Sequence, residues 1–528
     1  MMHLTQKLTK LFIAVLALSL LVACGASEAA PHLTEVTRLV TDTTSIEAPQ
    51  EAVADMAYAE EPIPDTNGLV PPNGEHASDM FFEDYGVNPF IDSEDDNLST
   101  FAIDVDTGAY TIMRRYLQDG VLPPDESVRV EEYINFFDQD YAIPQNEAFT
   151  IHLEGAPAPY GENENYQLVR VGIQGYEVDA SQRPDAMLIF VIDVSGSMER
   201  EDRLGLVKES LRLLVDELRP TDRVGIVVYG SQAEVILEPT YVDSRRKILN
   251  AIDSVQPNGS TNAEHGIMLA YELADEFYQE GDINRLILAS DGVANVGNTA
   301  AEAILQHSAA GISLSSFGFG MGNYNDVMME QLANQGDGSY AYIDSIQEAE
   351  RVFIDDLTST LLTIAKDAKI QVEFNENVVE RYRLLGYENR EVADEDFRND
   401  DIDAGEIGAG HSVTALYELK LADEAAPNDT ALTVYVRYED PDSGQVMEIQ
   451  QQISPGQFAD SFAQTSPRFQ LDAVVAEYAE ILRDSYWARE SDLASVALEA
   501  HRIAEYLPHD ADVQEFAALV SEAAALSN

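Results

Sequence analysis

The middle of the chain alternates between short apolar runs and segments with helical periodicity. Met187–Ile192 is a run of six apolar residues, which is typical of a parallel strand buried on both faces. Residues 203–219 follow with apolar side chains at every third or fourth position, as on a helix that buries one face. The same alternation predicts further strands at 223–229, 234–238, 285–290, 312–317 and 339–343, and further helices at 243–255, 264–279, 299–310, 325–335 and 345–365.

Strands that alternate with helices along the chain predict a parallel sheet covered by helices on both faces. We therefore expect an α/β domain over residues 185–366, with a doubly wound, mostly parallel sheet of the Rossmann-like kind. The segment at 234–238 is expected to form an edge strand, and the strand at 285–290 to lie beside the strand at 187–193.

The flanks of this domain have a period of two, which predicts half-buried strands. The pattern occurs at 148–155 and 166–175 in an N-terminal region (81–184), and again at 370–374, 413–421, 432–438 and 446–453 in a β-rich region (367–460). Helical periodicity returns after Pro467 and predicts a C-terminal helical segment (461–528). The pattern leaves open whether the two flanks form one composite domain around an inserted α/β module.

The first residues of the chain predict export. Lys7 and Lys10 precede an apolar stretch at 11–22, which is short for a membrane span and typical of a signal peptide. Leu21-Val-Ala-Cys24 contains the one cysteine of the chain and resembles the lipobox of bacterial lipoproteins. This resemblance implies that residues 1–23 are removed and that Cys24 is lipidated. A plain secretory signal with an accidental cysteine is the alternative.

Residues 24–80 are rich in acidic residues and proline without a sustained period, so we expect a flexible linker. Together with Cys24 it predicts a lipoprotein anchored in a membrane of the cell envelope, with its body outside the cytoplasm. The chain has 95 acidic and 31 basic residues and a formal net charge of −64. Such a surface repels phosphate and argues against nucleic acid as a partner.

Oxygen-bearing side chains follow the predicted strands at their carboxyl ends. Asp193-Val-Ser195-Gly-Ser197 follows the apolar run directly, while Thr261 lies before a predicted helix and Asp291 ends a neighbouring strand. Ligands of open α/β sheets bind at this edge, and such oxygens suit a hard divalent cation, Mg²⁺ or Mn²⁺. The alternative for the first triplet alone is a helix N-cap. The whole set predicts a metal site.

These five residues resemble the metal-ion-dependent adhesion site of von Willebrand factor type A domains. The resemblance implies that the serines and the threonine contact the metal, that the aspartates often act through water, and that one coordination position accepts a carboxylate of a protein partner. Four further segments are similar to the bacterial YfbK-like lipoproteins of this group: 85–92, 98–107, 317–324 and 405–411. Where relatives tend to be glycine-rich after the threonine, this chain has Asn262-Ala-Glu-His265, which either shapes the rim of the site or only begins a helix.

Sequence patterns typical of enzymes are weaker in this chain than the pattern of the metal site. Asp104-Val-Asp106-Thr107-Gly108 departs from the phosphatase pattern at its fifth position and lacks the glutamate and spacing of an EF-hand. The chain has no nucleophile elbow, no His-Glu-x-x-His and no Walker lysine. The glycines at 318, 320 and 322 are interpreted as loop turns, and His411 and His501 as isolated structural residues. We therefore expect no enzyme.

The sequence thus predicts an envelope lipoprotein that binds a protein partner through a metal in a type A domain. A structural scaffold with a merely stabilising metal and, less favoured, a metal-dependent hydrolase are the alternatives. Because related domains shift their last helix on ligand binding, the resemblance also implies that binding could move the helix at 345–365.

Overall fold

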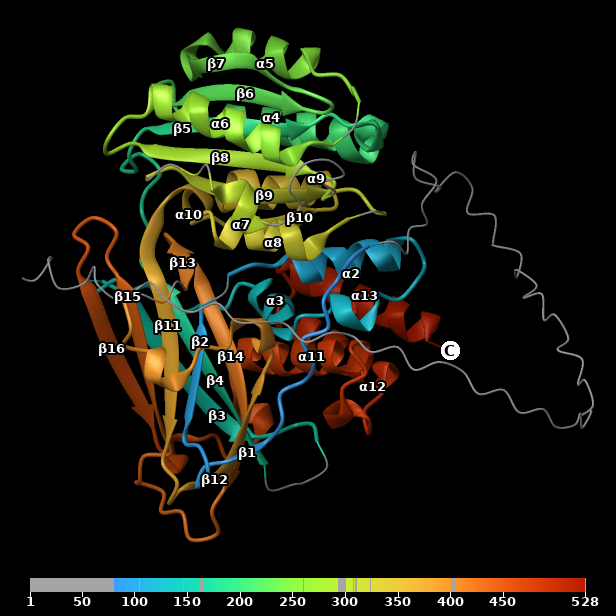
Figure 1. Cartoon of the computed structure of the whole chain (residues 1–528). Helices are drawn as coiled ribbons and strands as arrows, with labels where there is room; N and C mark the ends of the chain where they lie inside the picture. The colour runs from blue at the N-terminus through green and yellow to red at the C-terminus, as the bar shows by residue number, and fades with distance from the viewer. Residues whose placement is uncertain are drawn as a thin grey trace, which may run out of the picture. The chain divides into compact units, whose positions relative to one another are not determined.

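The computed structural model describes residues 80–527 except 104, 146, 162–165, 260, 293–300, 307, 309–310, 323, 401 and 403. Its α/β domain contains a six-stranded sheet in the order β10-β9-β8-β5-β6-β7 (Figure 1). The strands are β5 (Ala186–Asp193), β6 (Arg223–Tyr229), β7 (Ala233–Tyr241), β8 (Ile283–Ser290), β9 (Ser313–Phe319) and β10 (Tyr340–Ile343). All neighbours are parallel except β7, the predicted edge strand, which pairs antiparallel with β6.

Helices cover both faces of this sheet. They are α4 (Leu206–Glu217), α5 (Arg245–Ser254), α6 (Ala263–Phe277), α7 (Ala301–Leu305), α8 (Asp326–Asn334), α9 (Ile346–Glu350) and α10 (Leu357–Leu361). Alternate residues of β5 enter two separate cores: Phe190 packs with α4, α5 and α9, and Ile189 with α6, α7 and α8. Because β5 is buried on both faces, its sequence is apolar up to its last residue, Asp193. The predicted fold class is confirmed.

Strands from both flanks share a β-sandwich. One sheet has the order β1-β12-β14-β4-β3, and the other has the order β13-β11-β15-β16 with β2 paired to β11. The strands are β1 (Ile91–Asp92), β2 (Leu98–Ala102), β3 (Phe149–Pro157), β4 (Tyr166–Gly175), β11 (Thr363–Phe374), β12 (Val379–Leu385), β13 (Gly405–Gly408), β14 (Ser412–Leu421), β15 (Leu432–Glu439) and β16 (Val446–Ile453). The segments before and after the α/β domain therefore build one composite unit.

Helices from both ends of the described chain pack on the outer face of the first sheet of the sandwich. They are α2 (Gly108–Gln118), α3 (Val130–Asn135), α11 (Pro467–Leu482), α12 (Leu493–Tyr506) and α13 (Ala511–Leu526). Their apolar side chains share one core with Leu168 of β4 and Leu416 of β14. Within the described residues, no helix has the length and apolar character needed to cross a membrane.

The prediction of one long helix at 345–365 is wrong. The segment contains α9, a π-helical turn (Arg351–Asp355) and α10, and β11 already begins at Thr363. The helix ends there because Thr363 pairs with Gly408 of β13 and continues as a strand. β13 also lies close against α10, since a Cβ on Gly408 would lie 2.0 Å from the Ser359 carbonyl oxygen. The predicted domain boundary at residue 366 consequently falls inside β11. The predicted signal peptide, Cys24 and all of the predicted linker except Met80 lie outside the described residues.

Candidate metal site

The predicted ligands lie on loops that meet at the carboxyl end of the sheet. The strands β5 and β8, which end at Asp193 and just before Asp291, are direct neighbours, with Ile192 opposite Ala289. The backbone N–H of Gly196 donates to the Gly259 carbonyl at 2.9 Å, and this bond ties the loop of Ser195 and Ser197 to the loop that leads to Thr261. The structure thus brings the three predicted segments together.

Two serine hydroxyls of the first loop lie side by side. The Oγ atoms of Ser195 and Ser197 are 2.8 Å apart. The two hydroxyls share a hydrogen bond at this distance. Adjacent ligands of an octahedral Mg²⁺ with bonds of 2.0–2.1 Å are about 2.9 Å apart, so the spacing is also compatible with both hydroxyls binding one ion. Asp193 and Thr261 are buried as well, with exposed fractions of 0% and 1%.

The two aspartates differ in their partners. Asp193 is held on both oxygens: Oδ1 accepts from the Ser195 N–H at 2.7 Å and Oδ2 from the Ser290 hydroxyl at 3.1 Å. Asp291 Oδ2 accepts from Arg203 Nη1 at 2.7 Å, whereas its buried Oδ1 has no hydrogen-bond partner among the described residues. A buried carboxylate oxygen without a partner is costly unless a ligand or water satisfies it.

Burial and mutual repulsion of the two carboxylates set the electrostatics of the site. Burial, together with the charge of Asp291, raises the pKa of Asp193 to about 7. Burial also raises the pKa of Asp291, and the Arg203 guanidinium opposes this effect. When both carboxylates are ionised, one arginine leaves an excess of negative charge, which a divalent cation would neutralise.

The donor set consequently fits a hard divalent cation held by oxygen atoms. In the part of the chain that the structure describes, no group of three or more His, Cys, Asp or Glu side chains is placed to hold a metal. A metal site here would therefore need the hydroxyl groups of the predicted set.

Sequence reasoning missed two residues of this site, Ser290 and Arg203. Ser290 is the last residue of β8 and connects Asp193 to the Gly292 N–H, which donates to its hydroxyl at 3.1 Å. Arg203 lies in a π-helical turn before α4 and is 0% exposed. The sequence does not single it out, because two arginines, Arg200 and Arg203, stand among the acidic residues that follow Ser197.

The residues after Thr261 begin a helix. The Asn262 side chain caps α6 by accepting from the His265 N–H at 3.1 Å, and Glu264 lies in the first turn. An acidic residue in this position is favourable beside the helix dipole.

Other residues that the sequence singled out serve the packing of the described units. Asp106 accepts from the Tyr340 N–H at 3.0 Å and from Arg390, and Thr107 accepts from Arg351 at 3.1 Å, while Asp104 lies outside the described residues. His501 contacts the Ser521 hydroxyl at 3.0 Å. These contacts give the phosphatase pattern no support.

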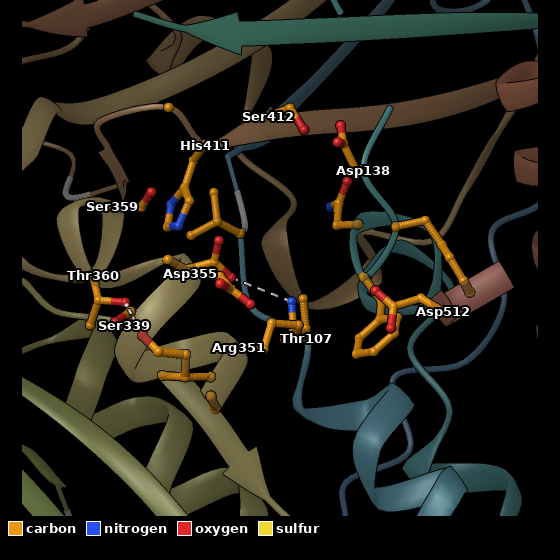
Figure 2. A pocket seen from close by; sticks show the side chains of 18 of the residues that line it. Thr107, Asp138, Ser339, Arg351, Asp355, Ser359, Thr360, His411, Ser412 and Asp512 are labelled. Atoms are coloured by element: carbon orange, nitrogen blue, oxygen red, sulfur yellow. Dashed lines mark hydrogen bonds and ion pairs between the residues drawn. The ribbon is translucent and has the colours of Figure 1, made fainter. Parts of the chain in front are cut away.

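His411 lines a cavity of about 640 Å³ beside the π-helical turn and α10. Figure 2 shows its ring among Ser359, Asp355 and Arg351. Burial and the nearby Arg351 guanidinium lower the pKa of His411 to about 4, so its ring is neutral at pH 7. None of the five predicted metal-site residues is among the described residues that line this cavity.

Three family models match the chain. Residues 359–526 match the model described as "Uncharacterized protein YfbK, C-terminal". Residues 188–293 match "von Willebrand factor type A domain", and residues 76–170 match "von Willebrand factor". The second of these matches spans all five predicted metal-site residues.

Three similar proteins illustrate the range of relatives. "Uncharacterized protein YfbK" of Escherichia coli (strain K12) is 40% identical over 66% of this chain, and the match spans 62% of that protein's length. "Uncharacterized protein sll0103" of Synechocystis sp. is 24% identical over 54% of this chain and 69% of its own length. Inter-alpha-trypsin inhibitor heavy chain H4 of Homo sapiens is 28% identical over 38% of this chain and 23% of its own length.

Two solved structures are similar at low sequence identity. A von Willebrand factor type A protein from Catenulispora acidiphila covers 72% of this chain and 90% of its own, with 15% identity and a TM-score of 0.42. The ArnB paralog VWA2 from Sulfolobus acidocaldarius covers 72% of this chain and 97% of its own, with 15% identity and a TM-score of 0.36. The family matches and the E. coli relative identify the chain as a YfbK-like protein that contains a von Willebrand factor type A domain.

Proposed function

We propose that this protein binds a protein partner through a divalent cation, Mg²⁺ or Mn²⁺, at Asp193, Ser195, Ser197, Thr261 and Asp291. A type A domain is itself suggestive of protein interaction or adhesion. The observation that carries the proposal is the pair of hydroxyls 2.8 Å apart beside a buried Asp291 oxygen that lacks a partner. A cation at this position would satisfy the Asp291 oxygen and would replace the hydrogen bond that the two hydroxyls share.

The residues of the site would have different roles in binding the ion. Ser195, Ser197 and Thr261 supply neutral oxygens, while Asp193 is held in place by its hydrogen bonds to Ser195 and Ser290. Neutral ligands leave much of the positive charge of a bound cation available, and this charge would attract a carboxylate of the partner. An acidic side chain, Asp or Glu, is therefore the expected contact of the partner.

The proposal includes a place in the cell. The lipobox-like Leu21–Cys24 and the linker at 24–80 support attachment to a membrane of the envelope through a lipid on Cys24. The linker would hold the body away from the membrane surface, where the metal site could meet an envelope protein.

Calorimetric titration of Mg²⁺ and Mn²⁺ tests the metal site. We would use the chain without its predicted signal peptide and with Cys24→Ser, beside folded Asp193→Ala and Thr261→Ala variants. Ser254→Ala, which changes an exposed hydroxyl on α5, is the control. We expect saturable binding by the parent and the control and loss of binding in both site variants. A folded parent that binds neither ion would contradict the proposal.

Capture from envelope extracts separates a binding protein from a scaffold. If the metal site binds the partner, capture should depend on Mg²⁺ and should be lost with Asp291→Ala. If the metal only stabilises the fold, that variant should melt at a lower temperature and still capture the same proteins.

The chain is proposed to be a binding protein without enzymatic activity. The curated relatives described above are two uncharacterised proteins and one inhibitor heavy chain. A metal-dependent hydrolase would instead turn over phosphoester or peptide substrates when loaded with Mg²⁺, and we expect no such turnover.

A further inference from the structure

A buried arginine joins the candidate metal site to a glycine-rich loop. Arg203 is fully buried, and its Nη1 donates to Asp291 Oδ2 at 2.7 Å and to the Ser197 carbonyl at 2.9 Å. Its Nη2 donates to the carbonyl oxygens of Met321 and Gly322. One guanidinium thus connects the loop of Ser195 and Ser197, the residue after β8 and the loop after β9.

The loop after β9 is shaped to receive this arginine. Gly320 has a φ of +79°, and a Cβ at this position would lie 2.5 Å from Cγ of Arg203. A side chain at 320 would therefore be strained by its backbone conformation and would also displace Arg203. This gives a physical role to Gly320, for which the sequence pattern predicts only a loop turn.

The geometry points to Arg203 as a positioning residue of the metal site, an inference that rests on the proposed function. Arg203 holds one oxygen of Asp291, so the carboxylate cannot rotate freely, and the other oxygen, Oδ1, is left without a partner. A group that holds a metal ligand from behind typically improves metal affinity 10- to 100-fold. We propose that Arg203 keeps Asp291 oriented for the cation.

Electrostatics alone would predict the opposite. A guanidinium close to a divalent cation repels it, so its removal would strengthen metal binding. The charge of Arg203 is already compensated by Asp291 at 2.7 Å, and its removal would leave Asp291 free to turn and the 321–322 carbonyls without their donor. We therefore expect the loss of orientation to outweigh the loss of repulsion.

The direct experiment is titration of Mg²⁺ into folded Arg203→Met and Arg203→Lys variants beside the parent. We expect Arg203→Met to weaken binding by about tenfold or more. Arg203→Lys keeps the charge but cannot donate to both loops at once. The Mg²⁺ affinity of this variant should therefore lie between that of the parent and that of Arg203→Met. Unchanged or tighter binding by Arg203→Met overturns the inference.

A double-variant cycle separates positioning from a general effect on folding. If Arg203 acts through Asp291, Arg203→Met should weaken the residual Mg²⁺ or Mn²⁺ binding of Asp291→Asn no further. Without metal, Arg203→Met should lower the melting temperature, and adding Asp291→Asn should recover part of the loss because no unpaired carboxylate remains. Additive losses of affinity would overturn the inference.

Gly320→Ala keeps the arginine but crowds it, and should also weaken Mg²⁺ binding. Gly281→Ala is the matched control, because Gly281 has a similar φ of +86° with nothing within 4 Å of the added Cβ. Two outcomes distinguish the proposed metal site from the proposed role of Arg203. If the parent binds no Mg²⁺, both proposals are refuted. If the parent binds Mg²⁺ and the Arg203→Met variant binds it equally tightly, only the role of Arg203 is refuted.

Discussion

Arg114 of α2 clamps Asp344, the residue that follows β10. Its Nε and Nη2 atoms donate to the two carboxylate oxygens of Asp344 at 2.7 and 2.6 Å, and Nη2 also donates to Glu348 at 2.9 Å. The side chains of Asp344 and Glu348 are 0% and 2% exposed. This ion pair joins the N-terminal region to the start of the last helical segment of the type A domain.

Arg114→Met is therefore expected to destabilise the protein strongly, because it leaves Asp344 buried without its cation. Loss of one partner from a buried ion pair costs about 3–5 kcal/mol of unfolding free energy. Urea unfolding followed by circular dichroism measures this loss. Arg212→Met, which removes an ion pair to Asp253 with side chains 39% and 59% exposed, is the control and should cost about 0–1 kcal/mol. Equal effects of the two variants would contradict the structural role of Arg114.

Ser290→Ala is expected to weaken Mg²⁺ binding about tenfold, because the Ser290 hydroxyl holds Asp193 from behind. The variant removes a single oxygen and adds no bulk, so the fold should persist. Calorimetric titration checks the affinity, with Ser254→Ala on α5 as the control. Binding as tight as in the parent would show that Asp193 does not depend on Ser290.

The buried Glu477 on α11 is expected to make the stability of the folded protein depend on pH. Burial raises the pKa of this carboxyl from its ordinary 4.5 to about 7, so the folded protein holds a proton that the unfolded chain releases. Its contribution to stability is present below about pH 4.5 and is lost as the pH rises toward 7. A shift of this size corresponds to roughly 3 kcal/mol.

Glu477→Gln should remove this part of the pH dependence, since glutamine stays neutral. Unfolding free energies measured from pH 4 to pH 8 should be similar for both proteins at pH 4 and higher for the variant at pH 8. Glu490→Gln, at an exposed position, should follow the parent throughout. A variant that loses stability with rising pH as the parent does would exclude Glu477 as the cause.

Metal and an acidic ligand are expected to change hydrogen exchange in residues 345–375. Phe353 in the π-helical turn packs on Phe317 of β9 with ring centroids 5.0 Å apart, and β9 leads into the loop that contacts Arg203. The turn also borders the cavity shown in Figure 2, which offers space for movement. Exchange measured with and without Mg²⁺ and an Asp-containing peptide checks this. Unchanged exchange in this segment would contradict the predicted movement.

The strand–helix order of the type A domain could be predicted because burial determines local composition. The apolar run at 187–192 reflects a strand covered on both faces, and the period of 3.6 in α4 reflects a helix with one buried face. Asp193 and Asp291 could be assigned to one edge because parallel strands end at the same edge of a sheet.

Only the tertiary structure decided which remote groups meet. Arg203 and Asp291 are 88 positions apart, and nothing in the local pattern selects that arginine as the partner of that carboxylate. The helix expected at 345–365 ends early because β11 pairs with β13. The helical periodicity of the sequence contains no information about this pairing. Periodicity reports how much of its own surface a segment buries, whereas the partner of a buried charge or of a strand edge depends on the packing of the whole chain.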